Sequence, residues 1–251
     1  MHIDLSDQTI LVTGASRGIG RAIAQALGTS GARVALHYHH SAEPAHALAD
    51  ELDAAQVFQA NLATVEGCTQ LLDDVTAALG QIDGLVNNAG VAVQLPLDDA
   101  DEAWAEGWAR TMHVNLRAPE LLCRRAIRHF RPHGGGRIIN VASRAAFRGD
   151  TPDYMAYAAS KGGLVALTRS IARGCGSDGI VAFTLAPGFT RTDMAQDFID
   201  TYGEDYATSD LALNRLTEPA DIAPTAVFLA SGLADHATGA TIDLNAGSYV
   251  H

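Results

Sequence analysis

The order of apolar segments constrains this chain more than any other feature. Short runs rich in β-branched residues alternate with longer segments of helical periodicity along its whole length. The predicted strands cover residues 9–13, 33–38, 56–60, 82–88, 136–143, 179–186 and 240–245, and helical periodicity is clear over 21–29, 64–79 and 154–173. Strands that alternate with helices form a parallel sheet covered by helices on both faces. The sequence therefore predicts an α/β fold, a doubly wound parallel sheet of about seven strands.

The chain length suits a single domain over residues 1–251, because no internal stretch has the Pro, Ser or charge content of a linker. Residues 188–214 have weak periodicity and many acidic side chains, so we expect a substrate-binding lid inserted there. Ligands of parallel sheets bind beyond the carboxyl ends of the strands. We therefore look for chemistry in the residues that directly follow each predicted strand.

The formal net charge of −12 argues against nucleic acid or an anionic membrane as a partner. Three cysteines, an odd number without metal-ligand spacing, are typical of small core residues in a reducing compartment. No secretory signal begins the sequence, and no apolar run approaches the roughly 20 residues that span a bilayer. We expect a soluble, cytoplasmic protein that binds no metal.

A glycine-rich turn, "TGASRGIG" at residues 13–20, lies between the first predicted strand and a helix. Turns use glycine for positive φ whatever their function, so the cluster alone is weak evidence. Its place before a helix N-terminus favours binding of a dinucleotide pyrophosphate by backbone amides. The expected contacts are Gly14, Ser16, Arg17, Gly18, Ile19 and Gly20.

Lys161 is the only lysine of the chain, which uses arginine at every other position that carries a permanent cation. It follows Tyr157 by four residues, so the two side chains share one helix face. An ammonium is compact and can exchange a proton, whereas a guanidinium is broad and always charged. A cation this close would lower the pKa of Tyr157 from about 10 to roughly 7–9, which suits proton transfer. Tyr154, the rival tyrosine, has only Ala158 four residues on.

Five motifs in order, spread between Thr9 and Gly247, resemble those of the classical short-chain dehydrogenase/reductase family, including members similar to 3-oxoacyl-[acyl-carrier-protein] reductase. They are "TGASRGIG", "NNAG" at 87–90, the serine that ends "GRIINVAS", the Tyr-x-x-x-Lys pair and "PGFTRTDM" at 187–194. The resemblance implies a Rossmann-type fold and hydride transfer between a nicotinamide cofactor and a carbonyl or secondary alcohol carbon.

The catalytic tetrad that the resemblance implies is Asn115, Ser143, Tyr157 and Lys161. Tyr157 would act as general acid or base, and Ser143 would hold the substrate oxygen. Lys161 would also bind the nicotinamide ribose, and Asn115 would kink its helix and hold a water that links Lys161 to solvent.

Further cofactor contacts are implied by the same resemblance. They are Asn61 and Leu62 after the third strand, Asn88, Ala89 and Gly90 of "NNAG", and Pro187, Gly188, Thr190 and Thr192 after the sixth strand. The bland alternative for Thr190 is a helix cap.

Tyr38 ends the second predicted strand, where NAD-preferring relatives commonly carry an acid, and His39, His40 and Ser41 follow it. Without that acid, and with Arg17 in the glycine turn, we expect NADP(H) to be preferred, with NAD(H) as the alternative. A metal site at His37 and His39 is disfavoured because no carboxylate or cysteine accompanies them. We expect His37 to be solvated.

A small ketone or secondary alcohol is the expected substrate, facing the mostly apolar residues Ala145, Phe147, Met155, Phe189 and Met194. Reduction of 3-oxoacyl-[acyl-carrier-protein] is an alternative, which the acidic charge and Asp178 disfavour. A dinucleotide sensor without catalysis is a second alternative, which the intact tetrad disfavours. The resemblance also implies a homotetramer or homodimer formed through helices near 103–131 and 154–173 and through the C-terminal region.

Overall fold

Seven parallel strands form one sheet, in the order β3-β2-β1-β4-β5-β6-β7. The computed structural model describes residues 3–196, 203 and 208–250. The strands are β1 (Thr9–Val12), β2 (Arg33–Tyr38), β3 (Ala55–Gln59), β4 (Gly84–Asn87), β5 (Gly136–Val141), β6 (Ile180–Pro187) and β7 (Thr241–Leu244). Each lies within about two residues of its predicted bounds, as expected for boundaries judged from sequence. The predicted doubly wound α/β fold is confirmed.

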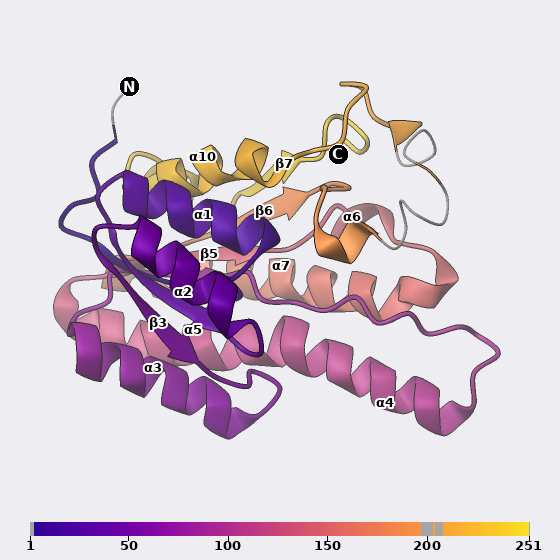
Figure 1. Cartoon of the computed structure of the whole chain (residues 1–251), viewed down its shortest axis with the longest axis horizontal. Helices are drawn as coiled ribbons and strands as arrows, with labels where there is room; N and C mark the ends of the chain where they lie inside the picture. The colour runs from indigo at the N-terminus through magenta and orange to yellow at the C-terminus, as the bar shows by residue number, and fades with distance from the viewer. Residues whose placement is uncertain (1–2, 197–202, 204–207, 251) are drawn as a thin grey trace.

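Helices cover both faces of the sheet (Figure 1). They are α1 (Gly18–Thr29), α2 (Ala42–Glu51), α3 (Val65–Leu79), α4 (Asp101–Met112), α5 (Ala118–Phe130), α6 (Ala145–Arg148), α7 (Met155–Cys175) and α10 (Pro219–Ala230). The buried core is correspondingly split into two clusters. Ile10 and Val12 of β1 pack in the cluster that holds residues of α1, α2 and α10, whereas Leu11 packs with α3, α5 and α7. This alternation follows from the two-residue period of a strand.

The strand order reverses between β1 and β4. The chain moves outward from β1 through β2 to β3, and then returns to place β4 on the other side of β1. Such a reversal opens a crevice at the carboxyl edge of the sheet. The glycine turn follows β1 and "NNAG" follows β4, so the fold places both motifs at this crevice.

The long helix expected near 103–131 is interrupted. Helices α4 and α5 are joined by a π-helical turn over His113–Arg117, with the fully buried Asn115 inside it. Turns of this kind often mark functional sites because they redirect a side chain. The irregularity expected at Asn115 is therefore present. No helix in the described part of the chain is long and apolar enough to span a membrane.

Gly20 lets α1 approach the edge of the sheet. A Cβ there would lie 2.2 Å from the carbonyl oxygen of Gly14 and 2.3 Å from Nδ2 of Asn88. We predict that Gly20→Ala lowers the free energy of unfolding by about 1–3 kcal/mol, because neither neighbour can yield cheaply. A Cβ at Gly174, in α7, would have no neighbouring heavy atom within 4 Å. The control Gly174→Ala should therefore raise stability by up to about 1 kcal/mol. Urea unfolding of both variants measures this, and equal stability of Gly20→Ala and wild type would contradict it.

Candidate active site

The glycine turn is held tightly against "NNAG". Gly14 and Gly18 have φ of +65° and +55°. The hydroxyl of Thr13 accepts hydrogen bonds from the backbone N–H groups of Asn88 (2.9 Å) and Ala89 (3.1 Å). In return, Nδ2 of Asn88 donates to the carbonyl oxygens of Thr13 (2.9 Å) and Gly14 (3.1 Å). The side chain of Asn88 therefore braces the turn.

The turn leads directly into the N-terminus of α1. Arg17 is the N-cap residue, makes no side-chain capping bond, and no acidic residue lies in the first helical turn. A helix N-terminus of this kind offers backbone N–H groups and a partial positive charge to an anion. The N–H groups at the start of α1 therefore fit the pyrophosphate of a dinucleotide.

His37 corrects a prediction. It is not solvated but 2% exposed, one residue before the end of β2. Its Nδ1 lies 3.1 Å from the backbone nitrogen of Gly14, and its Nε2 lies 3.2 Å from the carbonyl oxygen of Ala60. Burial is the main reason that its pKa falls to about 4. The side chain of His37 packs inside the protein, where the imidazole is neutral and both ring nitrogens have hydrogen-bond partners.

The residues after β2 lie beside the glycine turn. Tyr38 is buried, whereas His39 and His40 are exposed with ring centroids 3.6 Å apart. Ser41 is the N-cap residue of α2 and makes no side-chain capping bond. Helices α1 and α2 are neighbours, since Nη1 of Arg21 donates to the carbonyl oxygen of Pro44 at 3.3 Å. The N-termini of both helices therefore open onto the same edge.

Arg17 is paired across the crevice. Its Nη1 lies 3.1 Å from Oδ2 of Asp193, and the two side chains are 69% and 71% exposed. A Cβ at Gly18 would lie 3.2 Å from Cγ2 of Thr192. The segment after β6 thus contacts the glycine turn directly. An ion pair this exposed is weak and can exchange partners.

Lys161 is buried in α7, with 4% of its surface exposed. Its Nζ donates to the carbonyl oxygen of Val141, at 2.8 Å, where β5 ends. The ammonium also lies 5.7 Å from the ring centroid of Tyr157. Burial lowers the pKa of Lys161 to about 8. The predicted neighbours on the helix face are therefore brought together.

The pKa of Tyr157 corrects a second prediction. Burial raises it above the ordinary value, a hydrogen bond with Ser143 opposes the rise, and the charge of Asp150 adds to it. The expected lowering by Lys161 is wrong for this arrangement. The ammonium of Lys161 is directed at the carbonyl oxygen of Val141. In the absence of a charge directed at the phenol oxygen, desolvation decides the direction.

Ser143 and Asn115 complete the predicted tetrad. Ser143 is buried two residues after β5, and its Oγ accepts from the backbone of Ala145 at 3.1 Å. Asn115 binds both backbone groups of Val91, accepting from its N–H and donating to its carbonyl, each at 2.8 Å. A Cβ at Gly90 would lie 3.3 Å from Oδ1 of Asn115 and 3.5 Å from Nζ of Lys161. All four side chains therefore lie at the carboxyl ends of β4 and β5.

The motif after β6 lies beside the C-terminal segment. Pro187 ends β6, and Gly188 donates to the carbonyl oxygen of Leu244 at 2.9 Å. Thr190 is not a helix cap, because it forms a parallel bridge with Thr217. Its hydroxyl donates to the carbonyl oxygen of Gly188, at 3.1 Å.

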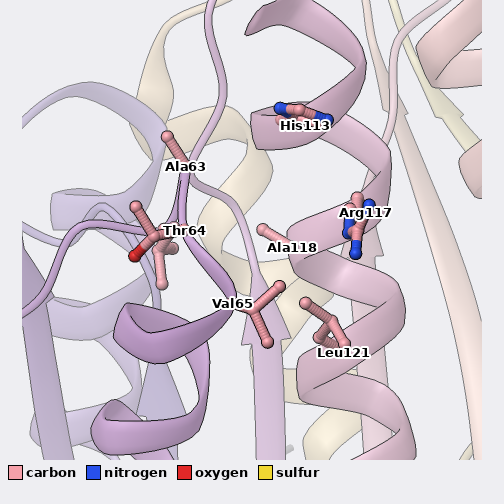
Figure 2. A pocket seen from close by; sticks show the side chains of 8 residues that line it. Ala63, Thr64, Val65, His113, Arg117, Ala118 and Leu121 are labelled. Carbon is pink, nitrogen blue, oxygen red and sulfur yellow. The ribbon is translucent and has the colours of Figure 1, made fainter. Parts of the chain in front are cut away.

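Asn61 and Leu62, the cofactor contacts predicted after the third strand, differ in their exposure to solvent. Leu62 is buried, whereas Asn61 is exposed and its Oδ1 accepts from the backbone of Ala63 at 3.0 Å. Leu62 lines a cavity of about 180 Å³ that lies between the start of α3 and the start of α5. Figure 2 shows Thr64 and Val65 on one side of it, opposite His113 and Arg117.

The predicted substrate residues divide into two groups. Ala145 is buried, and Phe147 packs beside the core cluster of α7 and stacks on Tyr249 with centroids 6.4 Å apart. Phe189 packs on a second cluster formed by Ala195, Leu211 and Leu216. Met155 and Met194 are 42% and 53% exposed. Part of the predicted lid, residues 197–202 and 204–207, lies outside the described residues.

Sequence reasoning missed three residues near this site. Arg144, directly after Ser143, and Arg148 both bind Oδ2 of Asp210, at 3.2 Å and 2.8 Å. They tie α6 to the described end of the segment that we predicted to be a lid. Acidic and basic residues far apart in sequence gave no signal of this pairing. Among the residues that the structure describes, no group of three or more potential ligands forms a metal site.

The low pKa of His37 makes stability depend on pH. The unfolded chain takes up a proton near pH 6.5, whereas the folded chain resists protonation until about pH 4. We predict that lowering the pH from 6.5 to 4 reduces the free energy of unfolding through this group by about 3 kcal/mol. Denaturant titrations of wild type and His37→Asn isolate the contribution, since other groups titrate in both proteins. Parallel pH profiles for the two proteins would refute it.

Comparison with known proteins identifies the family. A family model described as enoyl-(acyl carrier protein) reductase matches residues 14–249. The chain is 36% identical to 3-oxoacyl-[acyl-carrier-protein] reductase FabG of Staphylococcus aureus, over 97% of this chain and 98% of that protein. It is 34% identical to versicolorin reductase 1 of Aspergillus parasiticus, over 98% and 97% of the two chains.

A solved structure agrees with this assignment. It is a putative NAD(P)-dependent gluconate 5-dehydrogenase from Beutenbergia cavernae with bound NADP, which matches with a TM-score of 0.90 and 33% identity. The match covers 99% of both chains. The chain belongs to the short-chain dehydrogenase/reductase family of NAD(P)-dependent oxidoreductases.

Proposed function

We propose that this protein is an NADP(H)-dependent oxidoreductase that interconverts the carbonyl and secondary alcohol forms of a small molecule. The observation that carries the proposal is the arrangement of Ser143, Tyr157 and Lys161 at the carboxyl end of β5. A buried ammonium beside a phenol that is hydrogen-bonded to a serine is costly for the fold. Such a cost is typical of a catalytic site.

Each of these side chains has a distinct role in the proposed reaction. The cofactor, when bound, supplies or accepts the hydride. Ser143 orients the substrate oxygen by hydrogen bonding. Tyr157 donates its phenol proton to that oxygen during reduction and takes a proton from it during oxidation. Lys161 offsets the negative charge that develops on Tyr157, and Asn115 fixes the backbone beside it.

The pKa directions favour the reductive role near neutral pH. Tyr157 stays protonated because its pKa is raised, so it is ready to act as an acid. Lys161 stays charged below about pH 8. Loss of its charge above that pH removes the cation that stabilises the phenolate.

Reductive kcat/KM should therefore fall as the pH rises through about 8, the pKa of Lys161.

Tyr157→Phe should lower kcat by at least about 100-fold, since a general acid contributes 10²–10⁴-fold. Tyr154→Phe is the control and should leave kcat within about threefold of wild type, since no proton transfer depends on it. Steady-state kinetics on a panel of small ketones with NADPH measures both. If Tyr157→Phe kept full turnover, the enzyme proposal would fail and a dinucleotide sensor would be favoured.

The preference for NADP(H) is supported by the charges at the ends of β1 and β2. Arg17 is exposed at the N-terminus of α1, beside the N-terminus of α2. No acid occupies positions 38–41, and the first is Glu43. A 2′-phosphate would meet the Arg17 guanidinium and the donors of His39, His40 and Ser41. NAD(H) would use the same site without this charge pairing.

Fluorescence titrations with NADPH and NADH test this preference. We predict tighter binding of NADPH, and a loss of about tenfold or more in Arg17→Ala for NADPH but not for NADH, because charge-assisted bonds are the strong ones. Asp193→Asn is the opposite control. It frees Arg17 from its ion pair and should tighten NADPH binding by about twofold. Tighter binding of NADH by wild type would contradict the assignment.

Reduction of 3-oxoacyl-[acyl-carrier-protein] is the second candidate, because a relative 36% identical over nearly the full chain carries that name. The net charge of −12 opposes it, since carrier protein is acidic. Asp178, where such reductases often carry a base, instead pairs with Arg131 at 2.7 Å. Turnover of acetoacetyl-[acyl-carrier-protein] at the rate of the best small ketone would favour this candidate.

The substrate region proposed here includes Ala145, Phe147, Met155, Phe189 and Met194, with residues 188–214 as the lid.

We also propose a homodimer or homotetramer formed through α4, α5 and α7. A hollow of about 350 Å³ on this face is lined by Met112, Leu116 and Leu167, among others. Light scattering after size exclusion tests the assembly. The free cysteines of the described residues support the proposed cytoplasmic location.

A further inference from the structure

His37 lies where three loops of the carboxyl edge meet. Its ring is buried between the glycine turn that follows β1 and the segment that follows β3. Its own carbonyl oxygen also accepts the backbone N–H of Ala15, at 2.8 Å. The residue therefore contacts two successive amides of the glycine turn, those of Gly14 and Ala15.

The two ring bonds define a single tautomer. The backbone N–H of Gly14 is a donor, so Nδ1 must present its lone pair. The proton then resides on Nε2, which donates to the carbonyl oxygen of Ala60. Both nitrogens are used, and the ring is neutral. Among the groups that face it, the Ala60 carbonyl favours the charged form, whereas burial and nearby His39 disfavour it.

These bonds fix the peptide groups that lead into the turn. The backbone N–H of Gly14 is held by His37, and its carbonyl oxygen is held by Nδ2 of Asn88. Gly14 has positive φ, a conformation that permits several directions for the flanking amides. The amides further along the turn, at the N-terminus of α1, take their direction from these fixed peptide groups, and binding of a phosphate depends on that direction. Restraint on both sides therefore preorganises the turn.

We propose that His37 is a positioning residue for the cofactor, holding the glycine turn in its binding conformation through Nδ1. It does not touch the cofactor itself. The inference rests on the proposed dinucleotide site and adds a residue that determines affinity for it.

Two substitutions separate the two ring nitrogens. Asparagine places Oδ1 where His37 has Nδ1, so His37→Asn keeps the acceptor for Gly14. Glutamine places Nε2 near the position of the imidazole Nε2, so His37→Gln keeps the donor to Ala60 and loses that acceptor. His37→Leu removes both. The control is His129→Leu, because Nε2 of His129 also accepts a backbone N–H, from Ile82 at 3.1 Å, at the opposite edge of the sheet.

The readouts are the NADPH dissociation constant, from fluorescence titration, and kcat at saturating NADPH. We expect the NADPH affinity of His37→Asn to stay within about threefold of wild type. His37→Gln and His37→Leu should bind NADPH at least about tenfold more weakly, because both lose the buried hydrogen bond to Gly14. In all variants kcat at saturation should stay within about threefold, since no reacting atom is moved. His129→Leu should bind like wild type.

Several results would overturn the inference. Wild-type affinity in His37→Gln would show that the Gly14 bond does not matter for binding. Equal weakening in His129→Leu would show a general effect of lost stability. If His37→Leu does not fold, the NADPH dissociation constants of His37→Asn and His37→Gln still test the inference. Failure of wild type to bind either NADPH or NADH would remove the proposed function as well, whereas normal binding by wild type with indifferent variants would remove only this inference.

Discussion

The burial of one ammonium group organises the candidate active site. Nζ of Lys161 is removed from water and has the carbonyl oxygen of Val141 as its hydrogen-bond acceptor. Taking a cation out of water is expensive, and one neutral carbonyl offsets only part of the cost. The fold tolerates this because α7 is long and packs firmly on β5 and β6. The buried charge of Lys161 therefore has one hydrogen-bond acceptor among the described residues.

Hydrogen bonds to backbone groups hold the glycine turn in place. Thr13 and Asn88 connect the loop after β1 to the loop after β4 through four hydrogen bonds to the backbone. His37 connects it to the loop after β3. Residues at the ends of β2, β3 and β4 therefore hold the turn that follows β1. A binding site whose donors are fixed in advance loses little entropy when the ligand binds.

The sequence predicted the fold and the proximity of Tyr157 to Lys161 well, because both follow from local patterns. Strand bounds came from runs of β-branched residues, and the pairing of Tyr157 with Lys161 came from helical spacing. The pKa of Tyr157 and the burial of His37 were predicted wrongly, since both depend on contacts between segments far apart in the chain. For example, Gly14 and Ala60 lie on opposite sides of His37 in the sequence. The tie between Arg144 and Asp210 was missed for the same reason.

The most direct test of this account uses the single lysine. Protein grown with isotopically labelled lysine gives one side-chain signal, that of Lys161, whose titration can be followed by NMR without assignment. We predict a midpoint near pH 8, the value to which burial lowers the pKa of Lys161. A midpoint close to the ordinary lysine value of about 10.4 would mean that the ammonium is solvated. The central claim, that a buried cation beside Tyr157 organises this site, would then be wrong.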